Sequence, residues 1–174
     1  MMSGLRAITV VGTGLIGASA ALAARSTGAK VRGWDPDPEV LRVARERGAV
    51  DPAATLAEAV AGADLVLVAA PVAELPHVVR EVLDLASADC VVTDVGSTKS
   101  AVCAAARGDA RFIGGHPICG AETRGPDRAN AELFAGATWF LTPTAGTGPE
   151  LLRAVHGFVT SLGARPIALD ARAH

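Results

Sequence analysis

The stretch Val10-Val11-Gly12-Thr13-Gly14-Leu15-Ile16-Gly17 places three glycines between an apolar run and a segment of helical composition. The apolar run, Ala7–Val11, is predicted to be a strand, and Leu15–Ser26 is predicted to be a helix. Glycines at this spacing permit a tight turn, a close approach of the backbone to a phosphate, and close packing of the helix on the strand. The amino terminus of such a helix also favours negative charge. The stretch therefore predicts a site for the diphosphate of a dinucleotide.

The rest of the chain repeats this alternation of strand and helix. Apolar, β-branched runs predict further strands at 30–34, 64–69, 90–93, 111–113, 138–141 and 165–169. Segments of helical composition predict helices at 38–47, 54–61, 72–86, 98–106 and 149–161. The early strands lack polar alternation, as strands do in sheets that are covered on both faces. We therefore predict the α/β class: a Rossmann-type, doubly wound, mostly parallel sheet with helices on both faces, formed by residues 1–169 as one nucleotide-binding domain.

The choice of cofactor depends on Asp35, which ends the second predicted strand. A carboxylate there can accept hydrogen bonds from the adenosine ribose hydroxyls and repels a 2′-phosphate. The following residues, Pro36-Asp37-Pro38, contain no arginine that could hold such a phosphate. We therefore predict NAD rather than NADP. The residues predicted to contact the cofactor are Gly12, Gly14, Leu15, Ile16, Gly17, Asp35, Ala70 and Pro71.

The composition argues against several other classes of protein. Lys+Arg 16 against Asp+Glu 18 gives a formal net charge of -2, and aromatic residues make up 3%, so no nucleic-acid surface is predicted. The apolar runs are shorter than the roughly 20 residues that span a bilayer, and the first strand begins too early for a secretion signal. We expect a cytoplasmic protein without membrane contact. Cys90, Cys103 and Cys119 are widely spaced, so neither a disulfide framework nor a metal site is predicted.

Two polar segments follow neighbouring strands at the edge of the sheet where a ligand is expected. The segment 94–99 reads Asp-Val-Gly-Ser-Thr-Lys, and 116–122 reads His-Pro-Ile-Cys-Gly-Ala-Glu at the start of a long loop predicted at 114–130. A histidine that ends a strand and is restrained by a proline is typical of a held general base. From the residues alone, a structural role stays open as well: Ser97 as a helix cap, and Lys99 as a solvated charge.

With these motifs the chain resembles the nucleotide-binding domain of prephenate dehydrogenases, including their arogenate-using relatives. The glycine stretch, Asp35, the segments 94–99 and 115–122, and the segments Phe134-Ala135-Gly136 and Leu141-Thr142-Pro143 carry the resemblance over essentially the whole chain. It implies oxidative decarboxylation of prephenate or arogenate, with hydride transfer to NAD, in tyrosine biosynthesis. No metal is implied.

The resemblance also implies a role for each polar residue. His116 would accept the proton of the substrate hydroxyl, so the rate should fall as the pH drops through its pKa. Ser97 would hold the same hydroxyl or orient His116. Lys99 could attract a substrate carboxylate, and Glu122 resembles a loop carboxylate that pairs with a substrate-binding arginine in some relatives, with an exposed loop charge as the alternative. Ala121 stands where several relatives have Ser or Thr, which leaves prephenate and arogenate both open.

Members of the family continue into an all-helical domain that forms the dimer and completes the substrate pocket. We expect residues 170–174 to begin that domain, the full-length enzyme to be a homodimer, and this chain to bind NAD while being catalytically incomplete. One alternative is another two-domain dehydrogenase, acting on a β-hydroxyacid or an imine. The other is a module that binds NAD without catalysis.

Overall fold

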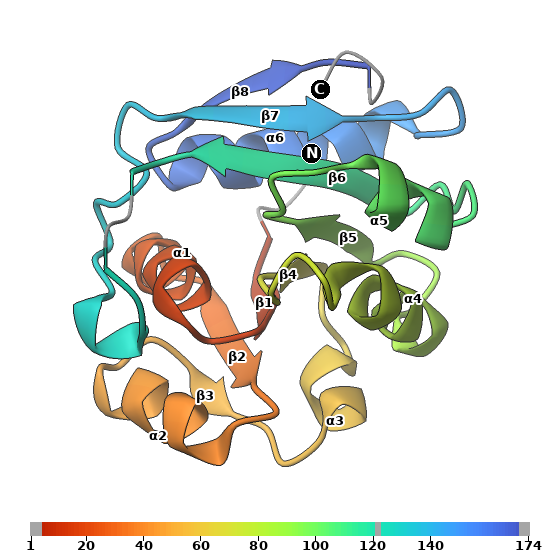
Figure 1. The fold of residues 1–174 in the computed structure, drawn as a ribbon. Coiled ribbons are helices and arrows are strands. Elements are labelled where there is room, and N and C mark those ends of the chain that lie inside the picture. Colours follow the sequence, from red (N-terminus) through yellow and green to blue (C-terminus); the bar gives the residue numbers. More distant parts are fainter. Residues whose placement is uncertain (1–4, 121–122, 171–174) are drawn as a thin grey trace.

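Residues 5–120 and 123–170 are described by a computed structural model, in which they form one eight-stranded sheet with helices on both faces (Figure 1). Ala121 and Glu122 lie outside the described residues, as do residues 171–174. The strands are β1 (Ala7–Val11), β2 (Lys30–Trp34), β3 (Asp51–Pro52), β4 (Leu65–Val68), β5 (Val91–Asp94), β6 (Phe112–Ile118), β7 (Thr138–Thr142) and β8 (Arg165–Ala168). The helices are α1 (Leu15–Ser26), α2 (Pro38–Glu46), α3 (Leu56–Val60), α4 (Leu75–Leu85), α5 (Ser100–Ala105) and α6 (Pro149–Ser161), with a 3₁₀ turn η1 (Pro126–Arg128).

The order of the strands fixes where a ligand can enter. The order is β3-β2-β1-β4-β5-β6-β7-β8, and β1 to β6 run parallel. The direction of winding reverses between β1 and β4, so the loops that leave their carboxyl ends diverge and leave a crevice. The predicted doubly wound, mostly parallel sheet is therefore confirmed, and its crevice opens directly after Val11.

Two apolar clusters fill the two faces of the sheet. One packs α1 and α6 against the strands, and the other packs α3, α4 and α5 against the opposite face (Figure 1). Successive side chains of a strand point to opposite faces. In β4, Leu65 and Leu67 accordingly join the first cluster, whereas Val66 and Val68 join the second. This two-sided burial explains why the early strands carry no polar alternation.

Strand β6 differs from the prediction. The segment 114–130 was predicted to be one long loop, but its first five residues continue β6 and pair antiparallel with β7. A Cβ on Gly114 would lie 2.2 Å from Thr142 Oγ1, and a Cβ on Gly115 would lie 2.4 Å from the carbonyl oxygen of Asp94. These glycines therefore allow neighbouring strands to approach closely, whereas the pattern of glycine and proline suggested turns.

Each edge of the sheet carries a proline. Strand β3, which the sequence did not predict, ends in Pro52, and the amide of Ala53 donates to β2 at 2.9 Å. At the other edge, the amide of Arg165 donates to Ala137 O at 2.8 Å. Because amides alternate in direction along a strand, the positions of Pro52 and Pro166 face away from the sheet. Neither proline interrupts the ladder.

The glycine turn brings α1 directly against β1. Gly12 has a φ of +88°, which L side chains rarely adopt, and a Cβ there would lie 2.7 Å from Ala69 O. A Cβ on Gly17 would lie 1.9 Å from Gly12 O, so the helix rests on the turn itself. Gly14 has no neighbouring atom within 4 Å of the same position. Gly12 and Gly17 are therefore needed for the close packing of the turn and the helix, whereas the position of a Cβ on Gly14 is open space.

We expect Gly17→Ala to lower the free energy of unfolding by about 2–3 kcal/mol, because the added methyl meets a backbone carbonyl that moves only with the turn. Gly14→Ala is the matched control, since its φ is -69° and its methyl enters open space, so the change should stay below about 1 kcal/mol. Urea unfolding followed by circular dichroism measures both. An unchanged midpoint for Gly17→Ala would contradict the packing described above.

Candidate functional site

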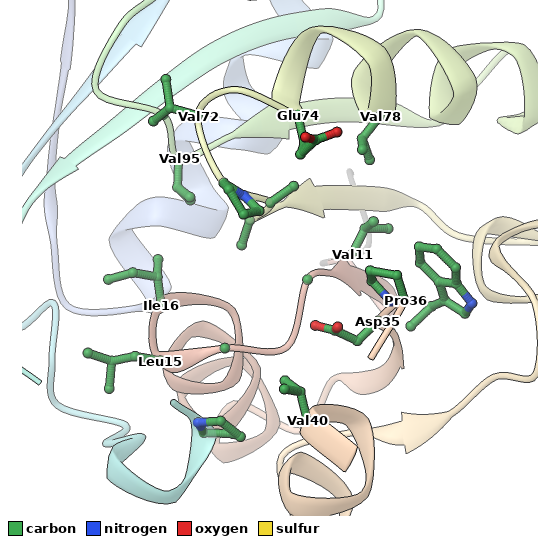
Figure 2. Close-up of a pocket in the computed structure, with 18 of the residues that line it drawn as sticks. Val11, Leu15, Ile16, Asp35, Pro36, Val40, Val72, Glu74, Val78 and Val95 are labelled. Carbon is green, nitrogen blue, oxygen red and sulfur yellow. The ribbon is translucent and has the colours of Figure 1, made fainter. Parts of the chain in front are cut away.

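A cleft of about 950 Å³ lies at the carboxyl ends of β1 and β4 (Figure 2). Of the predicted cofactor contacts, Gly17 is the one outside its wall, because it packs under the glycine turn. The others line the cleft: Gly12, Gly14, Leu15, Ile16, Asp35, Ala70 and Pro71. Figure 2 shows that valines from β1, α2 and α4 surround the same space, so the cleft combines a polar turn with apolar walls.

Helix α1 begins at this cleft without a capping side chain. Its N-cap is Gly14, which makes no side-chain cap bond, and its first turn holds no acidic residue. The first amides of a helix have no intrahelical acceptor, and they carry the positive end of the helix dipole. Amides directed at the open space beside Gly14 suit an anionic diphosphate. The residues present therefore fit the phosphate part of a dinucleotide.

Asp35 lies half-buried at the end of β2 and lines the same cleft. Its Oδ2 accepts a hydrogen bond from the amide of Thr13 at 2.7 Å, and its Oδ1 accepts one from the amide of Asp37 at 2.9 Å. Figure 2 shows the carboxylate beside the glycine turn. Because a carboxylate has about four acceptor positions, these two bonds hold Asp35 in place and leave acceptors for a ribose diol.

Asp94, at the end of β5, forms a buried ion pair with Lys99. The two side chains are 0% and 1% exposed, and Lys99 Nζ donates to Asp94 Oδ2. The carboxylate also accepts hydrogen bonds from the amides of Gly96 at 2.9 Å and Gly115 at 3.0 Å. Burying a charged side chain away from water is costly unless the charge is paired and hydrogen-bonded in this way. Asp94 thereby ties the turn that follows β5 to strand β6.

Ser97 and Lys99 lie in different environments. Ser97 is exposed and lines the cleft, but it does not cap α5, which begins at Ser100 with Lys99 as its N-cap. The solvated placement of Lys99 that the sequence left open is wrong, because the residue is 2% exposed. Its ammonium is engaged by Asp94, so the contact predicted between Lys99 and a substrate carboxylate gains no support from this arrangement.

His116 lies in β6 opposite Phe140 and is half-buried. The strand continues beyond it to Ile118, so the expectation that His116 ends a strand is wrong by two residues. His116 is not among the residues that line the cleft. It follows Gly115 directly, and the amide of Gly115 binds Asp94. Ser97 and His116 therefore belong to the two segments that Asp94 joins, although only Ser97 forms part of the cleft wall.

A segment that the predicted contacts omitted also lines the cleft. It consists of Thr123, Arg124, Gly125 and Pro126, the last of which begins η1. The polar composition of 114–130 marks the region as functional, but no motif or period relates it to the glycine turn so much earlier in the chain. The two are brought together by long-range contacts with α1, namely the packing of η1 and a hydrogen bond from Asn130 to Ser19.

The cysteines give no sign of a reactive thiol. Cys90 is fully buried, and this burial raises the pKa of its thiol to about 11. Burial also raises the pKa of Cys103 and of Cys119, so little thiolate forms at neutral pH. Within residues 5–120 and 123–170, no group of three or more His, Cys, Asp or Glu side chains could hold a metal ion. In the same residues no helix has the length and apolar character needed to cross a membrane.

Known proteins resemble this chain along nearly its whole length. A family profile described as the nucleotide-binding domain of prephenate dehydrogenase matches residues 20–168. A protein of Streptomyces niveus named as a probable prephenate dehydrogenase is 34% identical over 173 residues, which cover 98% of this chain and 47% of that protein. The chain spans about half the length of the curated relatives it matches.

Two crystal structures share the fold closely. Arogenate dehydrogenase from Synechocystis has a TM-score of 0.90 at 32% identity, over 97% of this chain and 61% of that one. Prephenate dehydrogenase from Aquifex aeolicus, in complex with hydroxyphenyl propionate and NAD+, has a TM-score of 0.91 at 27% identity, over 100% of this chain and 63% of that one.

We expect Lys99→Met to lower the free energy of unfolding by about 3–5 kcal/mol, because it leaves the Asp94 carboxylate buried without its cation. Adding Asp94→Asn should recover much of that loss, since the pair is then neutral. Arg42→Gln, which removes two exposed ion pairs on α2, with Glu39 and Glu46, is the surface control and should have little effect. Urea unfolding of the four proteins forms the test, and a double variant no more stable than Lys99→Met would refute a coupled pair.

Proposed function

Because this chain belongs to the prephenate dehydrogenase family and carries its nucleotide-binding domain, we propose that it binds NAD as the cofactor half of an enzyme that oxidises and decarboxylates prephenate or arogenate. The cleft carries the proposal: the uncapped start of α1 and the open space at Gly14 suit a diphosphate, and Asp35 suits a ribose. The Aquifex aeolicus relative is a complex with NAD+, which supports the same cofactor here.

Asp35 supports NAD over NADP. Two backbone amides hold its carboxylate in place, so it cannot swing away from a ligand without losing both hydrogen bonds. A 2′-phosphate would then meet a fixed negative charge at short range. Glu74 and Glu81 line the cleft as well, and they add to the repulsion.

The proposed reaction removes a hydride from the ring carbon that bears the substrate's hydroxyl and a proton from the hydroxyl itself. Loss of the ring carboxylate as carbon dioxide then leaves an aromatic ring. NAD, when bound, accepts the hydride. The protein's part is to position the alcohol and to take its proton, which we assign to Ser97 and His116 respectively. The anchoring of both segments by Asp94 supports this division, because a base and a hydroxyl must keep a fixed separation.

The proposal extends to the whole enzyme, of which this chain is the cofactor-binding part. The substrate, the homodimer and a cytoplasmic location are predictions, and the chain covers about half of its curated relatives. The role assigned to Glu122 also stays a prediction. An NAD-binding module without catalysis is the alternative, and the contributions of His116 and Ser97 to turnover distinguish the two.

The purified chain should bind NAD+ at least about tenfold more tightly than NADP+ in calorimetric titrations, because Asp35 repels the extra phosphate. Asp35→Asn keeps the shape of the side chain and one acceptor oxygen but removes the charge. It should therefore reduce the ratio of the affinity for NAD+ to the affinity for NADP+. Asp37→Asn is the control: this neighbouring carboxylate caps α2 outside the cleft, and asparagine caps a helix equally well. Equal affinity of the wild-type chain for both dinucleotides would count against the assignment.

In a preparation that turns over prephenate or arogenate, His116→Asn should lower kcat by about 100-fold or more, since the base is lost. The dissociation constant for NAD+ should change by less than about twofold, because His116 lies outside the cleft wall. Ser97→Ala should lower kcat as well. His156→Asn on the exposed face of α6 is the matched control and should leave kcat unchanged. Near wild-type turnover by His116→Asn would exclude it as the base.

A further inference from the structure

We propose that Arg124 binds the diphosphate of the dinucleotide, as a cationic contact that the glycine turn does not supply. The inference rests on the proposed binding of NAD. It concerns a residue that lies outside every motif by which the cofactor site was predicted, in the segment between β6 and η1.

The charges in the cleft single out this residue. Among the described residues that line it, Arg124 contributes the only arginine or lysine side chain, whereas three carboxylates, those of Asp35, Glu74 and Glu81, line the same cleft. Arg124 is exposed, and no hydrogen bond or ion pair joins it to another described residue. Its guanidinium is therefore available to a ligand, unlike the ammonium of Lys99.

The backbone of this segment is held against α1, whose amino terminus is the phosphate end of the cleft. Pro126 is buried, and η1 packs against α1. The amide of Asn130 donates to Ser19 Oγ in the second turn of the helix at 3.0 Å. Gly125, with a φ of +88°, supplies the turn between Arg124 and η1. The segment that holds Arg124 is thus anchored on α1, and Arg124 lines the same cleft as Leu15 and Ile16 of its first turn.

Electrostatics favour a cation at this end. A diphosphate carries two negative charges, and the start of a helix offers the equivalent of about half a positive charge. The carboxylates that line the cleft oppose an anion, and Figure 2 shows Glu74, the N-cap of α4, across the cleft from Leu15 and Ile16. An arginine on the side of α1 offsets this repulsion and can donate two parallel hydrogen bonds to phosphate oxygens.

A carboxylate of the substrate offers similar chemistry to a guanidinium. The two contacts have different consequences for binding. A contact with the diphosphate strengthens the binding of any ligand that contains a diphosphate, even one without the nicotinamide ring and in the absence of substrate. The segment is anchored on α1 rather than on the turn after β5 that holds Ser97, and this favours the diphosphate.

The test compares three ligands in calorimetric titrations of the purified chain: NAD+, ADP-ribose and adenosine. Arg124→Gln should weaken NAD+ and ADP-ribose by about tenfold, because a charge-assisted pair is lost, and should leave adenosine unchanged. Arg124→Lys should recover part of the loss. The control is Arg128→Gln, which removes the same charge from η1, where the side chain is exposed and outside the cleft wall. It should change each affinity by less than about twofold.

The outcomes separate the two levels of the proposal. If the wild-type chain binds neither NAD+ nor ADP-ribose, the proposed function fails and the contact fails with it. If the wild-type chain binds both and Arg124→Gln binds them equally well, the contact alone is overturned. A defect that appears only with prephenate or arogenate present would also overturn it, and would assign Arg124 to a substrate carboxylate. If Arg128→Gln weakened the binding of NAD+ and ADP-ribose as much as Arg124→Gln does, the effect would come from the net charge of the protein, and the proposed contact would be overturned.

Discussion

One carboxylate, that of Asp94, joins the parallel and antiparallel parts of the sheet. Strands β5 and β6 pair only at Val92↔Phe112 and Thr93↔Ile113, and from Gly114 onward β6 pairs with β7. Beyond that point the Asp94 side chain accepts the amide of Gly115, in place of a further bond between the strands. The buried cation of Lys99 makes this arrangement possible, because burying a carboxylate without a cationic partner is costly. A shift of β6 along β5 would break the hydrogen bond between Asp94 and Gly115 together with the strand pairing beside it.

The sequence predicts most of the fold because its strongest signals are local. The glycine turn with its flanking strand and helix, and the long apolar strands, appear where they were expected. Strand β3 was missed because two residues that include a proline carry no strand signal. The continuation of β6 was missed because Gly114, Gly115 and Pro117 are read as turn residues, whereas here they serve contacts with strands distant in sequence. Such contacts leave no periodic pattern.

The candidate site was predictable where a motif encodes it. The cofactor residues around the turn, together with Asp35, meet in one cleft as the spacing indicates. The environment of Lys99 was not predictable, because a lysine near the start of a helix is usually solvated, and only the fold reveals that Asp94 encloses it. Arg124 escaped prediction for a related reason, since its place in the cleft wall depends on how the neighbouring turn η1 packs against α1.

The prolines at the two edges bear on how the protein behaves when it is concentrated. An exposed edge strand offers free amides and carbonyls that can template the addition of another chain, which is a common route to aggregation. Here Pro52 and Pro166 each remove an amide that would face outward, and β3 is only two residues long. Sheets of neighbouring molecules therefore cannot join edge to edge without leaving carbonyls unpaired. The two edges of this wide sheet therefore offer poor templates for the growth of fibrils.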